Sequence, residues 1–462
     1  MTVIDKIKSL FIKNHYVNDP DPWTLPSRDY RIAGKNPYFR TTLIDLSIEE
    51  DEINSYYTGI LNVVADACVG TVPMLLGQHG NNTINDDLED RWLEWATMQN
   101  IGHALRECRR DACKTGIGIL VPYIRKTVDY PIKLAFKNVP STDLSSPLNF
   151  DPNVDIQNGI EYNENGDITA IWIKEDNEWG SERYSVPAQA IVWTKPKNLI
   201  LPECGPAFCL FPSVRRFMAA IMRAEEFRSS IPLAVELDPM VYKPDDTMGT
   251  PSGRFEYEPG WVPTLPPGTK LTGVNVAPQG EERSKFIELV ISAAARCKNM
   301  PKNIALGDSS NHNMASAQID IEPWKNTVEI DRFDFEPLVR QVFKLWYEAA
   351  LLVESYLLPV SRAASNNFTY SLNYMRLYTH PDPNKKANAR MTDLISGSTT
   401  LYRIHTDEGR NPRRELDKEA QLLGVTRDDL NKMYLGARQF KTLEALKLLP
   451  EDQDQNENNK RA

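Results

Sequence analysis

The stretch "NHNMASAQIDIEPWKNTVEIDRFDF", from Asn311 to Phe335, decides how the rest of the chain is interpreted. It begins with polar residues, passes through small ones and continues with apolar residues at helical spacing. From Ala317 onward that spacing predicts one long helix, with apolar positions Ile321, Trp324, Val328, Phe335, Leu338, Val342 and Leu345. Pro323 and Pro337 each remove a backbone donor, so we expect kinks or a break. Nothing in the stretch looks catalytic by itself.

The composition is that of a folded protein with an acidic balance. The chain has 462 residues, with 53 Lys and Arg against 63 Asp and Glu and a formal net charge of −10. This length predicts two to four domains or subdomains. A protein that grips nucleic acid statically usually has the reverse balance, because neutralising phosphates drives that binding. Either DNA is not a ligand, or DNA must move past the protein without being held.

The cysteines and the apolar runs favour an intracellular protein. The six cysteines form no CxxC pair and have no histidine at zinc-finger spacing, so we expect reduced, mostly buried thiols and no metal. The longest apolar stretch, residues 345–360, is interrupted by Glu348 and Glu354 and is too short to span a bilayer. No signal peptide opens the chain. We therefore expect a soluble product without a membrane partner.

The first part of the chain predicts an extended arm and then a helical region. Residues 1–45 lack periodicity, and a helical pattern runs from about Ile48 to Leu76. Asn85 fits an N-cap, followed in the first turn by carboxylates that suit the helix dipole, Asp86, Asp87 and Glu89. A metal site is the less favoured interpretation of these acids, because no partner ligands are visible.

Helical and strand patterns alternate after this point. Residues 104–116 continue helically, and residues 117–124 predict a strand. Asn165-Gly166 stands between two β-rich runs, which predicts a hairpin because both residues tolerate positive φ. The sequence up to about residue 211 therefore predicts an α+β region.

Two helices then flank a different kind of segment. Residues 212–237 start at a proline and place apolar residues on one face, Val214, Phe217, Met218, Ile221 and Met222. Residues 281–300 form a second such helix, with Phe286, Val290, Ala294 and Cys297 on one face. Between them, residues 238–280 are rich in Pro and Gly and strand-like. Downstream, residues 385–424 predict two helices around a Gly/Ser/Thr turn, and residues 451–462 a disordered tail.

One enzymatic interpretation competes with a structural one. Gly307-Asp308-Ser309 matches the nucleophile block of SGNH esterases, and His380 is a conceivable base. That family places the block directly after a first strand and an Asp three residues before its histidine, where this chain has Leu377. No other catalytic motif is visible. We therefore expect no enzyme activity and no cofactor, with an SGNH-like esterase using Ser309 as the alternative.

The order of the pieces resembles the portal proteins of tailed bacteriophages, in particular the lambda-type family. That family carries an Asn-Tyr-Ser-Ser-Ala-Arg motif after a loop, and the corresponding stretch here is "NMASAQ", residues 313–318. The preceding "MPKNIALGD" is similar to the family's short Pro-containing run, and "HPDPNKKANAR" with "GSTTLYRIHTDEGRNPRRELDKEAQLLG" is similar to its C-terminal pattern. The likeness runs from about Arg183 to Val425. Met314 and Gln318 depart from the motif's Tyr and Arg.

The resemblance implies an α+β portal fold with wing, helical stem, small β-rich clip and helical crown, assembled as a ring. The implied parts are an N-terminal arm (1–45), wing (46–211), first stem helix (212–237), clip (238–280), second stem helix (281–303), tunnel loop (304–313), long kinked helix with further wing (314–384), crown-side helices (385–450) and disordered tail (451–462). The implied channel-facing loop residues are Asp308, Ser309, Ser310, Asn311, His312 and Asn313. Tyr257 and Trp261 are candidates for the clip interface, and a local core role fits them equally well.

The implied function is that of a DNA conduit. The resemblance predicts a homo-oligomeric ring, normally a dodecamer, at one capsid vertex of a virion, assembled in the host cytoplasm. Its implied partners are the terminase large subunit, the major capsid protein, a head–tail connector and double-stranded DNA passing without sequence specificity. Another ring-forming virion connector is the alternative, although connectors are usually shorter.

This function explains the opening stretch. Small residues would let the copies crowd around a narrow axis, and neutral polar side chains would offer rearrangeable contacts to phosphates. The acidic balance fits, because each Lys or Arg contact would deepen DNA binding and slow transit.

Overall fold

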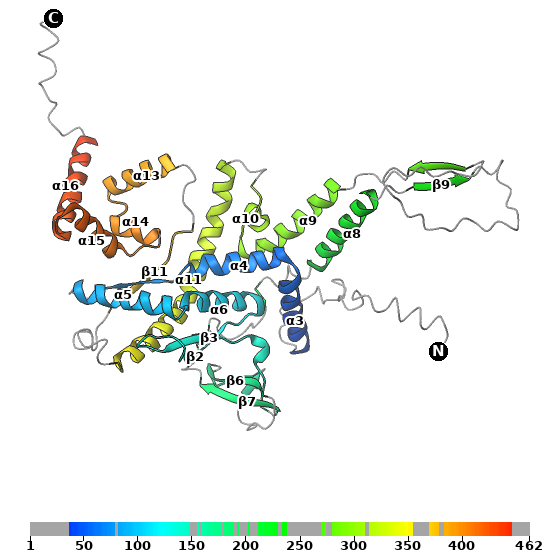
Figure 1. Ribbon diagram of the computed structural model, residues 1–462, viewed down its shortest axis with the longest axis horizontal. Helices are drawn as coiled ribbons and strands as arrows, with labels where there is room; N and C mark the ends of the chain where they lie inside the picture. Colours follow the sequence, from blue (N-terminus) through cyan, green and yellow to red (C-terminus); the bar gives the residue numbers. More distant parts are fainter. Residues whose placement is uncertain are drawn as a thin grey trace, which may run out of the picture. The chain divides into compact units, whose positions relative to one another are not determined.

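The computed structural model of the protein describes residues 37–78, 82–147, 155–157, 159–165, 167–177, 180–187, 192–193, 202–203, 211–229, 233–237, 269–273, 280–309, 314–353, 369–377 and 383–445. These residues form a mixed structure of mainly helices and small antiparallel sheets (Figure 1). The chain divides into a smaller unit, Met1–Ser27 with Ala207–Ala294, and a larger unit, Arg28–Pro206 with Ala295–Ala462. Among the described helices, none has the length and apolar character needed to cross a membrane.

The long helix α11, Met314–Leu351, supplies the core of the larger unit. Its Phe343 and Trp346 pack against Trp92 and Trp95 of α5, Asn82–Met98, with ring centroids 5.4 to 5.8 Å apart. Five of the predicted apolar positions are buried, Trp324, Val328, Phe335, Leu338 and Val342, while Ile321 and Leu345 are half-buried. The helical period therefore identified the face that packs.

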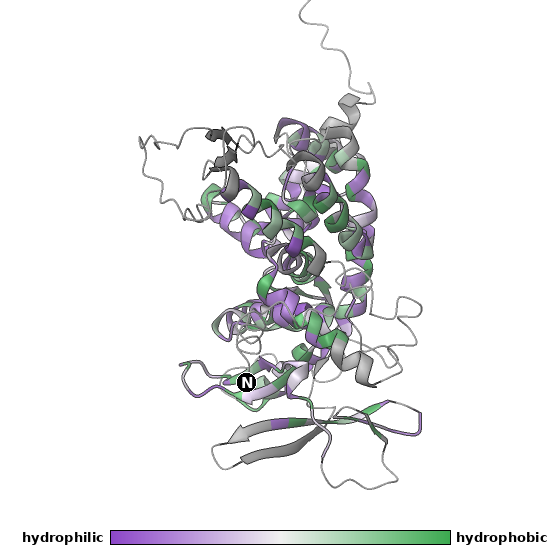
Figure 2. Cartoon of the chain, turned by 90° about the vertical axis from the view of Figure 1, so that its right-hand side faces the viewer, coloured by the Kyte–Doolittle hydropathy of each residue, from purple (hydrophilic) through white to green (hydrophobic). Residues whose placement is uncertain are grey.

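The expected break in this helix does not occur. Pro323 and Pro337 both lie inside α11, which runs unbroken past them. Both prolines are exposed, so water can satisfy the carbonyl groups that each proline leaves without a helical donor. Figure 2 shows hydrophilic and hydrophobic residues interleaved along the helices of the chain, the pattern of helices with one packed and one solvated face.

The start of the described chain differs from the prediction. Helix α3, Pro37–Ile53, begins inside the expected extended arm, of which residues 1–36 lie outside the described part. Helix α4, Ser55–Val69, is separate because the Asn54 side chain accepts hydrogen bonds from the N–H groups of Tyr56 and Tyr57. The helical pattern expected up to Leu76 is wrong at its end, since Met74–Gly77 is strand β1, paired with β11, Tyr370–Asn373.

Two further sheets follow. Helix α6, Ile101–Thr115, and strand β2, Ile119–Ile124, confirm the predicted helix and strand. Strand β2 lies between β3, Leu134–Asn138, and β8, Val192–Trp193. The other sheet has the order β4, β5, β6, β7, with bounds Asp155–Gln157, Ile160–Tyr162, Ile168–Asn177 and Gly180–Pro187.

The hairpin predicted at Asn165-Gly166 is the β5–β6 connection. Its turn is longer than two residues: the Asn163 N–H donates to the Asp167 carbonyl at 2.9 Å.

The smaller unit contains two helices and a strand pair. Helix α8 is Phe211–Ser229 and helix α9 is Gly280–Ala295. The predicted helix 212–237 is too long, because Leu233–Leu237 is strand β9, paired antiparallel with β10, Thr269–Gly273. Pro232, which cannot donate a helical hydrogen bond, precedes that strand. The candidate interface residues Tyr257 and Trp261 lie outside the described residues.

Residues 383–445 form the C-terminal helical group. Over residues 385–424 it has three helices, α13, α14 and α15, where the sequence predicted two. Its helices are α13, Pro383–Ser396, α14, Leu401–Asp407, α15, Pro412–Leu423, and α16, Arg427–Ala445. Thr400 caps α14 and Asn411 caps α15 through their side-chain oxygens. The turn at Gly409, with φ of 74°, ends the helical pattern between them.

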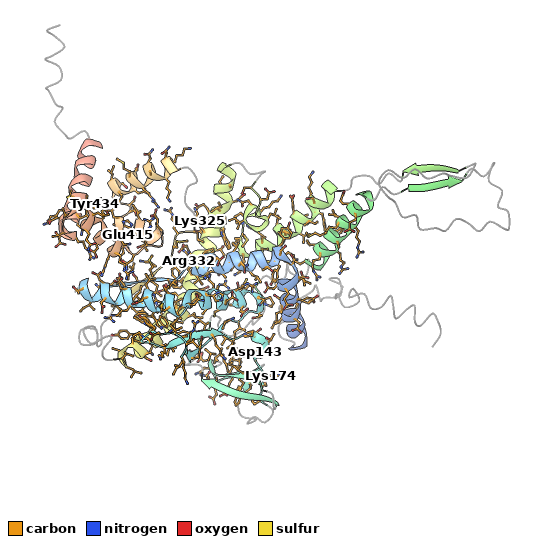
Figure 3. All side chains as sticks on the ribbon, in the orientation of Figure 1. Asp143, Lys174, Lys325, Arg332, Glu415 and Tyr434 are labelled. Atoms are coloured by element: carbon orange, nitrogen blue, oxygen red, sulfur yellow. The ribbon has the colours of Figure 1, made fainter. Side chains whose placement is uncertain are left out.

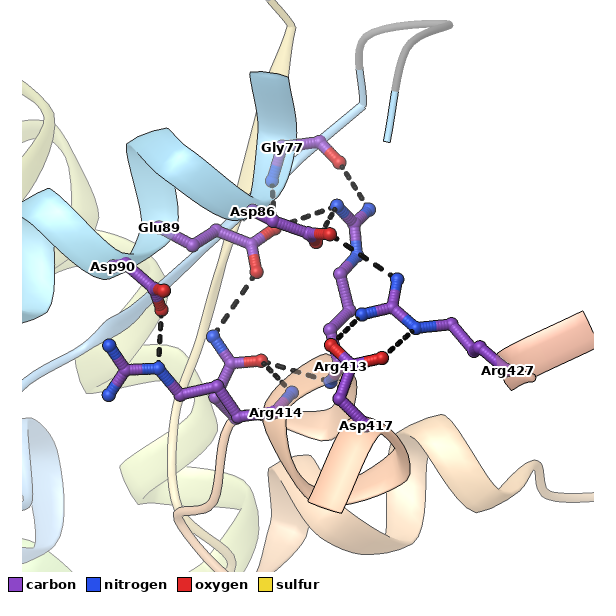
Figure 4. Close-up of polar contacts among 9 residues, drawn as sticks. Gly77, Asp86, Glu89, Asp90, Arg413, Arg414, Asp417 and Arg427 are labelled. Carbon is purple, nitrogen blue, oxygen red and sulfur yellow. Dashed lines mark hydrogen bonds and ion pairs between the residues drawn. The ribbon is translucent and has the colours of Figure 1, made fainter. Parts of the chain in front are cut away.

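An arginine–carboxylate network, which we call the tether, joins this group to α5 and β1 (Figure 4). Arg413 Nη1 lies 2.9 Å from Asp86 Oδ1 and 3.7 Å from Glu89 Oε1, and Arg427 Nη1 lies 3.3 Å from Asp86 Oδ2. Glu89 also accepts a 2.8 Å hydrogen bond from the Gly77 N–H, and Arg413 donates to the Gly77 carbonyl at 3.3 Å. Burial raises the pKa of Glu89, although these donors oppose the shift.

The tether corrects the N-cap predicted at Asn85. Helix α5 begins three residues earlier, at Asn82, so Asn85 is not its N-cap. The acids that follow Asn85 form ion pairs with arginine side chains. Asn85 is 1% exposed and lies against Gly77, where a Cβ atom would be 2.4 Å from its Oδ1. Glycine at residue 77 is what allows this close approach.

We expect Arg413→Ala to loosen the C-terminal helical group. It leaves the buried Glu89 and the Gly77 carbonyl with fewer partners, so the group should lose about 1–3 kcal/mol of stability. Hydrogen exchange of α15 and α16 measures this directly. Arg414→Ala is the matched control, because the Arg414–Asp90 pair is 49% and 40% exposed and should contribute about 0–1 kcal/mol. Equal exchange in the two variants would contradict the role of the tether.

Candidate functional site

The predicted loop follows a short helix. After α9, the chain forms a 3-10 turn, η3, Arg296–Lys298, and then helix α10, Lys302–Leu306. Residues 304–306 of the expected loop are therefore helical. Gly307 ends α10 with φ of 66°, and the Asp308 N–H donates to the Asn303 carbonyl at 3.1 Å. Asp308 and Ser309 are exposed on this turn, while Ser310, Asn311, His312 and Asn313 lie outside the described residues.

A cluster of four buried charges lies beneath this segment. Arg109 of α6 contacts both carboxylates, with Nη2 3.0 Å from Glu203 Oε2 and 2.9 Å from Asp331 Oδ2. Lys298 of η3 pairs with Glu203 as well, and its Nζ lies 3.5 Å from Asp331 Oδ2. Two cations therefore share two anions, and the four-charge cluster is formally neutral.

The cluster is well shielded from solvent. Side-chain exposure is 5% for Arg109, 7% for Glu203, 10% for Lys298 and 18% for Asp331. Burial by itself would lower the pKa of Lys298, but Glu203, Cys113 and Asp331 together outweigh burial and raise that pKa above its ordinary value. The stabilisation is therefore complete at neutral pH, below the ordinary lysine pKa, and is lost only as an alkaline solution passes the raised value.

Other contacts fix the same segment to the long helix. Asn299, at a φ of 52°, donates from Nδ2 to the Thr327 hydroxyl of α11 at 2.9 Å. Arg332, labelled on α11 in Figure 3, donates to the Ala67 carbonyl at 2.8 Å and to the Met375 carbonyl at 2.8 Å. The segment just before the exposed turn at Gly307–Ser309 is therefore held to α11 and, through the four-charge cluster, to α6. Helix α11 is in turn held to α4 by Arg332.

No short sequence pattern pointed to this cluster. Its residues are spread from position 109 to position 331, and each stands in an unremarkable local context. The one available signal was a lysine and an aspartate within otherwise apolar-patterned helical segments, and many such residues are simply solvated.

The geometry does not favour the esterase alternative. Ser309 follows a helix, not a strand, and it lies on an exposed turn. His380 lies outside the described residues. Within the described part of the chain, no three His, Cys, Asp or Glu side chains gather as a metal site requires. The acids once considered as ligands, Asp86 and Glu89, face arginines instead.

None of the described cysteines forms a disulfide. Cys68, Cys108 and Cys113 are buried and Cys297 is exposed, which agrees with the prediction of mostly buried thiols. Burial raises the pKa of Cys68 to about 11, so it stays protonated at neutral pH. Cys204 and Cys209 lie outside the described residues.

The two helices of the smaller unit have partly exposed apolar side chains. Phe217 of α8 contacts Phe286 of α9, with ring centroids 4.9 Å apart. Of the predicted α8 face, only Val214 is buried, while Phe217 is 39%, Met218 37% and Met222 64% exposed. On α9, Leu289 is 66% exposed. Such faces are typical of helices that pack against a further surface.

Comparison with known proteins identifies a family. The family described as "Phage portal protein, lambda family" matches residues 38–332, well over half of the chain. No curated protein matches.

Two solved structures show weak similarity to this chain. One is the neck of an empty gene transfer agent particle, at 11% identity and a TM-score of 0.40, covering 82% of this chain and 94% of that one. Another is an HK97 family phage portal protein from Corynebacterium diphtheriae, at 11% identity and a TM-score of 0.30, covering 60% of this chain and 85% of that one. Similarity this weak carries no functional conclusion, so the assignment depends on the family match.

We expect Glu203→Gln to destabilise the larger unit strongly. The substitution keeps the size of the side chain but leaves two buried cations with one anion, which costs about 3–5 kcal/mol. For a unit of this size the midpoint of thermal unfolding should fall by roughly 4–7 °C. Glu348→Gln is the control, because the Lys344–Glu348 pair is 74% and 56% exposed and should shift stability by no more than about 0.5 kcal/mol. Similar midpoints for both variants would rule out a structural role for the cluster.

Proposed function

The chain belongs to the lambda family of phage portal proteins, and we propose that its copies form a dodecameric ring at one vertex of the capsid. In this ring the protein is the channel through which terminase packages the viral genome and through which the genome later leaves. The observation that carries the proposal is the family match across residues 38–332, which spans both helices of the smaller unit, the exposed turn and the first half of α11.

The parts of the chain take the following roles in the proposal. Residues 46–211 belong to the wing, and residues 212–237 and 281–303 contribute the stem through α8 and α9. Residues 238–280, which contain β10 and directly follow β9, form the clip that meets terminase and then the head–tail connector. The C-terminal helices form the crown side of the ring. The partly exposed apolar faces of α8 and α9 support this assignment, because stem helices in a ring must pack against neighbouring copies.

The tunnel loop is the proposed DNA-facing element. It contains Asp308 and Ser309 on the exposed turn, followed by Ser310, Asn311, His312 and Asn313. A carboxylate and neutral polar groups bind phosphate weakly, so DNA can slide past them, whereas a lysine or arginine at these positions would hold it. The four-charge cluster supports the proposal, because it fixes the base of the turn.

The protein acts as a structural component of the virion, without catalysis, and it assembles in the host cytoplasm with the major capsid protein. DNA passes without sequence readout, since a ring channel presents the same side chains to every base step.

Electron imaging with native mass measurement tests the assembly. Purified protein should form closed rings with a central hole and the mass of a dodecamer. A protein that remains monomeric and hydrolyses ester substrates, with activity lost in Ser309→Ala, would overturn the proposal in favour of the esterase alternative.

We expect the charge at residue 308 to control DNA transit. Asp308→Lys adds one cation per subunit to the channel, so packaging into capsids carrying this variant should slow several-fold at low salt and recover as salt rises. Asp308→Asn has no added cation and should package at close to the wild-type rate. Rates are measured by nuclease protection of DNA in capsids, at two or more salt concentrations. Equal rates for the lysine and asparagine variants would show that residue 308 does not face the DNA.

A further inference from the structure

The hairpin formed by β2 and β3 has an excess of positive charge. Residues 119–139 contain four cations, Arg125, Lys126, Lys133 and Lys137, and one carboxylate, Asp129. The hairpin therefore has a formal charge of +3, whereas the whole chain has −10. In the view of Figure 1, β2 and β3 lie below α6, and α10, which precedes the tunnel loop, lies above it. The hairpin is thus a different surface from that loop.

The strand register places three of these cations on one face. The Arg125 N–H donates to the Lys133 carbonyl at 2.8 Å, so these two residues stand opposite each other. Tyr123 is two residues from Arg125 along one strand, and Lys137 is four residues from Lys133 along the other. Opposed residues of antiparallel strands share a face, and so does every second residue along a strand. Tyr123, Arg125, Lys133 and Lys137 therefore form one surface, which we call the cationic face.

The burial of the rest of the hairpin agrees with this placement. Ile119 and Val139, farther along the same face, are buried in an apolar cluster with residues of β5 and β6. Leu120 and Phe136, which alternation assigns to the opposite face, are buried in the core with residues of α5 and α11. The hairpin is therefore fixed on both sides at its base, and the cationic face is the part that extends beyond the β5–β6 cluster.

The cations of this face are available to a ligand. Lys133 and Lys137 are exposed, and Arg125 is half-buried. Within the part of the chain that the structure describes, none of these three side chains forms an ion pair or a hydrogen bond. The arginines of the neighbouring helix α6 are by contrast all paired with carboxylates, Arg106, Arg109 and Arg110. The cationic face is thus a place where positive charge is not used within the chain.

The composition of the face favours a phosphate backbone over a protein partner. The centre of a protein interface is apolar and aromatic and is depleted of charge, whereas Tyr123 is the one aromatic side chain of this face. Ile124 is 68% exposed, but alternation directs it to the opposite face.

The dimensions of the face suit double-stranded DNA. Lys133 and Lys137 are four strand residues apart, about 13 Å, a length over which a DNA duplex has about eight phosphate charges. Every cation of the face can therefore meet a phosphate of a duplex that lies along it. The hydroxyl of Tyr123, which is 38% exposed, is a group that donates to phosphate oxygens in protein–DNA contacts.

We propose that the cationic face binds the phosphate backbone of double-stranded DNA, weakly and without reading its sequence. Arg125, Lys133 and Lys137 neutralise phosphates, and Tyr123 donates a hydrogen bond. This surface goes beyond the proposed function, because it lies outside the tunnel loop and needs no ring. Three such contacts give a slope of about −2.7 for the logarithm of affinity against the logarithm of salt concentration. The contact is therefore easily reversed.

Covalently closed circular DNA tests the proposal, because a circle has no end to thread through a channel. Binding of the full-length protein is measured by filter retention of the circle at a series of salt concentrations. Lys133→Gln/Lys137→Gln removes two of the three phosphate contacts, so the salt slope should fall to about one-third of the wild-type slope. Affinity at low salt should fall with it. An unchanged midpoint of thermal unfolding checks that the hairpin still folds.

A second pair of lysines provides the matched control. Lys418→Gln/Lys432→Gln removes the same charge from α15 and α16, where these side chains are 66% and 75% exposed. This variant should retain the circle with the wild-type salt slope. Asp129→Asn, which removes the one carboxylate of the hairpin, should strengthen retention at low salt.

The outcomes separate this surface from the ring. Equal salt slopes for the hairpin variant, the control and the wild type would overturn the proposal and leave the proposed function intact. A hairpin variant that keeps its DNA binding but loses the native mass of the ring would also overturn it, because the face would then bind an acidic protein surface. Wild-type protein that stays monomeric contradicts the ring, but retention of the circle that depends on Lys133 and Lys137 would still support the DNA-binding face.

Discussion

The neutral pairing of Arg109 and Lys298 with Glu203 and Asp331 is the interaction on which the larger unit depends. It joins α6, the segment at residues 202–203, η3 and α11 at one buried point. Buried charges are stable only when all of their partners are present, because a buried charge without a partner lowers the stability of the fold. The cluster therefore specifies how four segments distant in sequence come together, in a way that interchangeable apolar contacts do not.

Three described arginines of this acidic protein serve to hold it together. Arg109 lies in the cluster, Arg332 binds two carbonyl groups, and Arg413 holds the tether. Each is paired within the chain, so a count of cations overstates the positive charge available to a phosphate. The net charge is −10, and these three arginines are engaged within the chain. Both features disfavour tight DNA binding, which needs cations available to phosphates.

Periodic features were predictable from sequence, and long-range ones were not. The buried face of α11, helix α6, strand β2 and the hairpin near Asn165 follow from local spacing, which is read within a dozen residues. A break at Pro323, one of the two expected effects, does not occur, and at this exposed position water can reach the carbonyl group that lacks a helical donor. Strand β9 was missed because a short apolar run fits either helix or strand, and the cap at Asn85 because its acids serve the tether. The four-charge cluster depends on residues that only folding brings together.

The length of α11 has a mechanical consequence. Its 38 residues extend about 57 Å, with the turn before its first residue and the tryptophans Trp92, Trp95 and Trp346 near its last. A continuous helix transmits force along its axis, and in α11 only Pro323 and Pro337 leave a turn without its backbone hydrogen bond. A load applied near the first residue of α11 would therefore reach the packed rings of Trp92, Trp95 and Trp346.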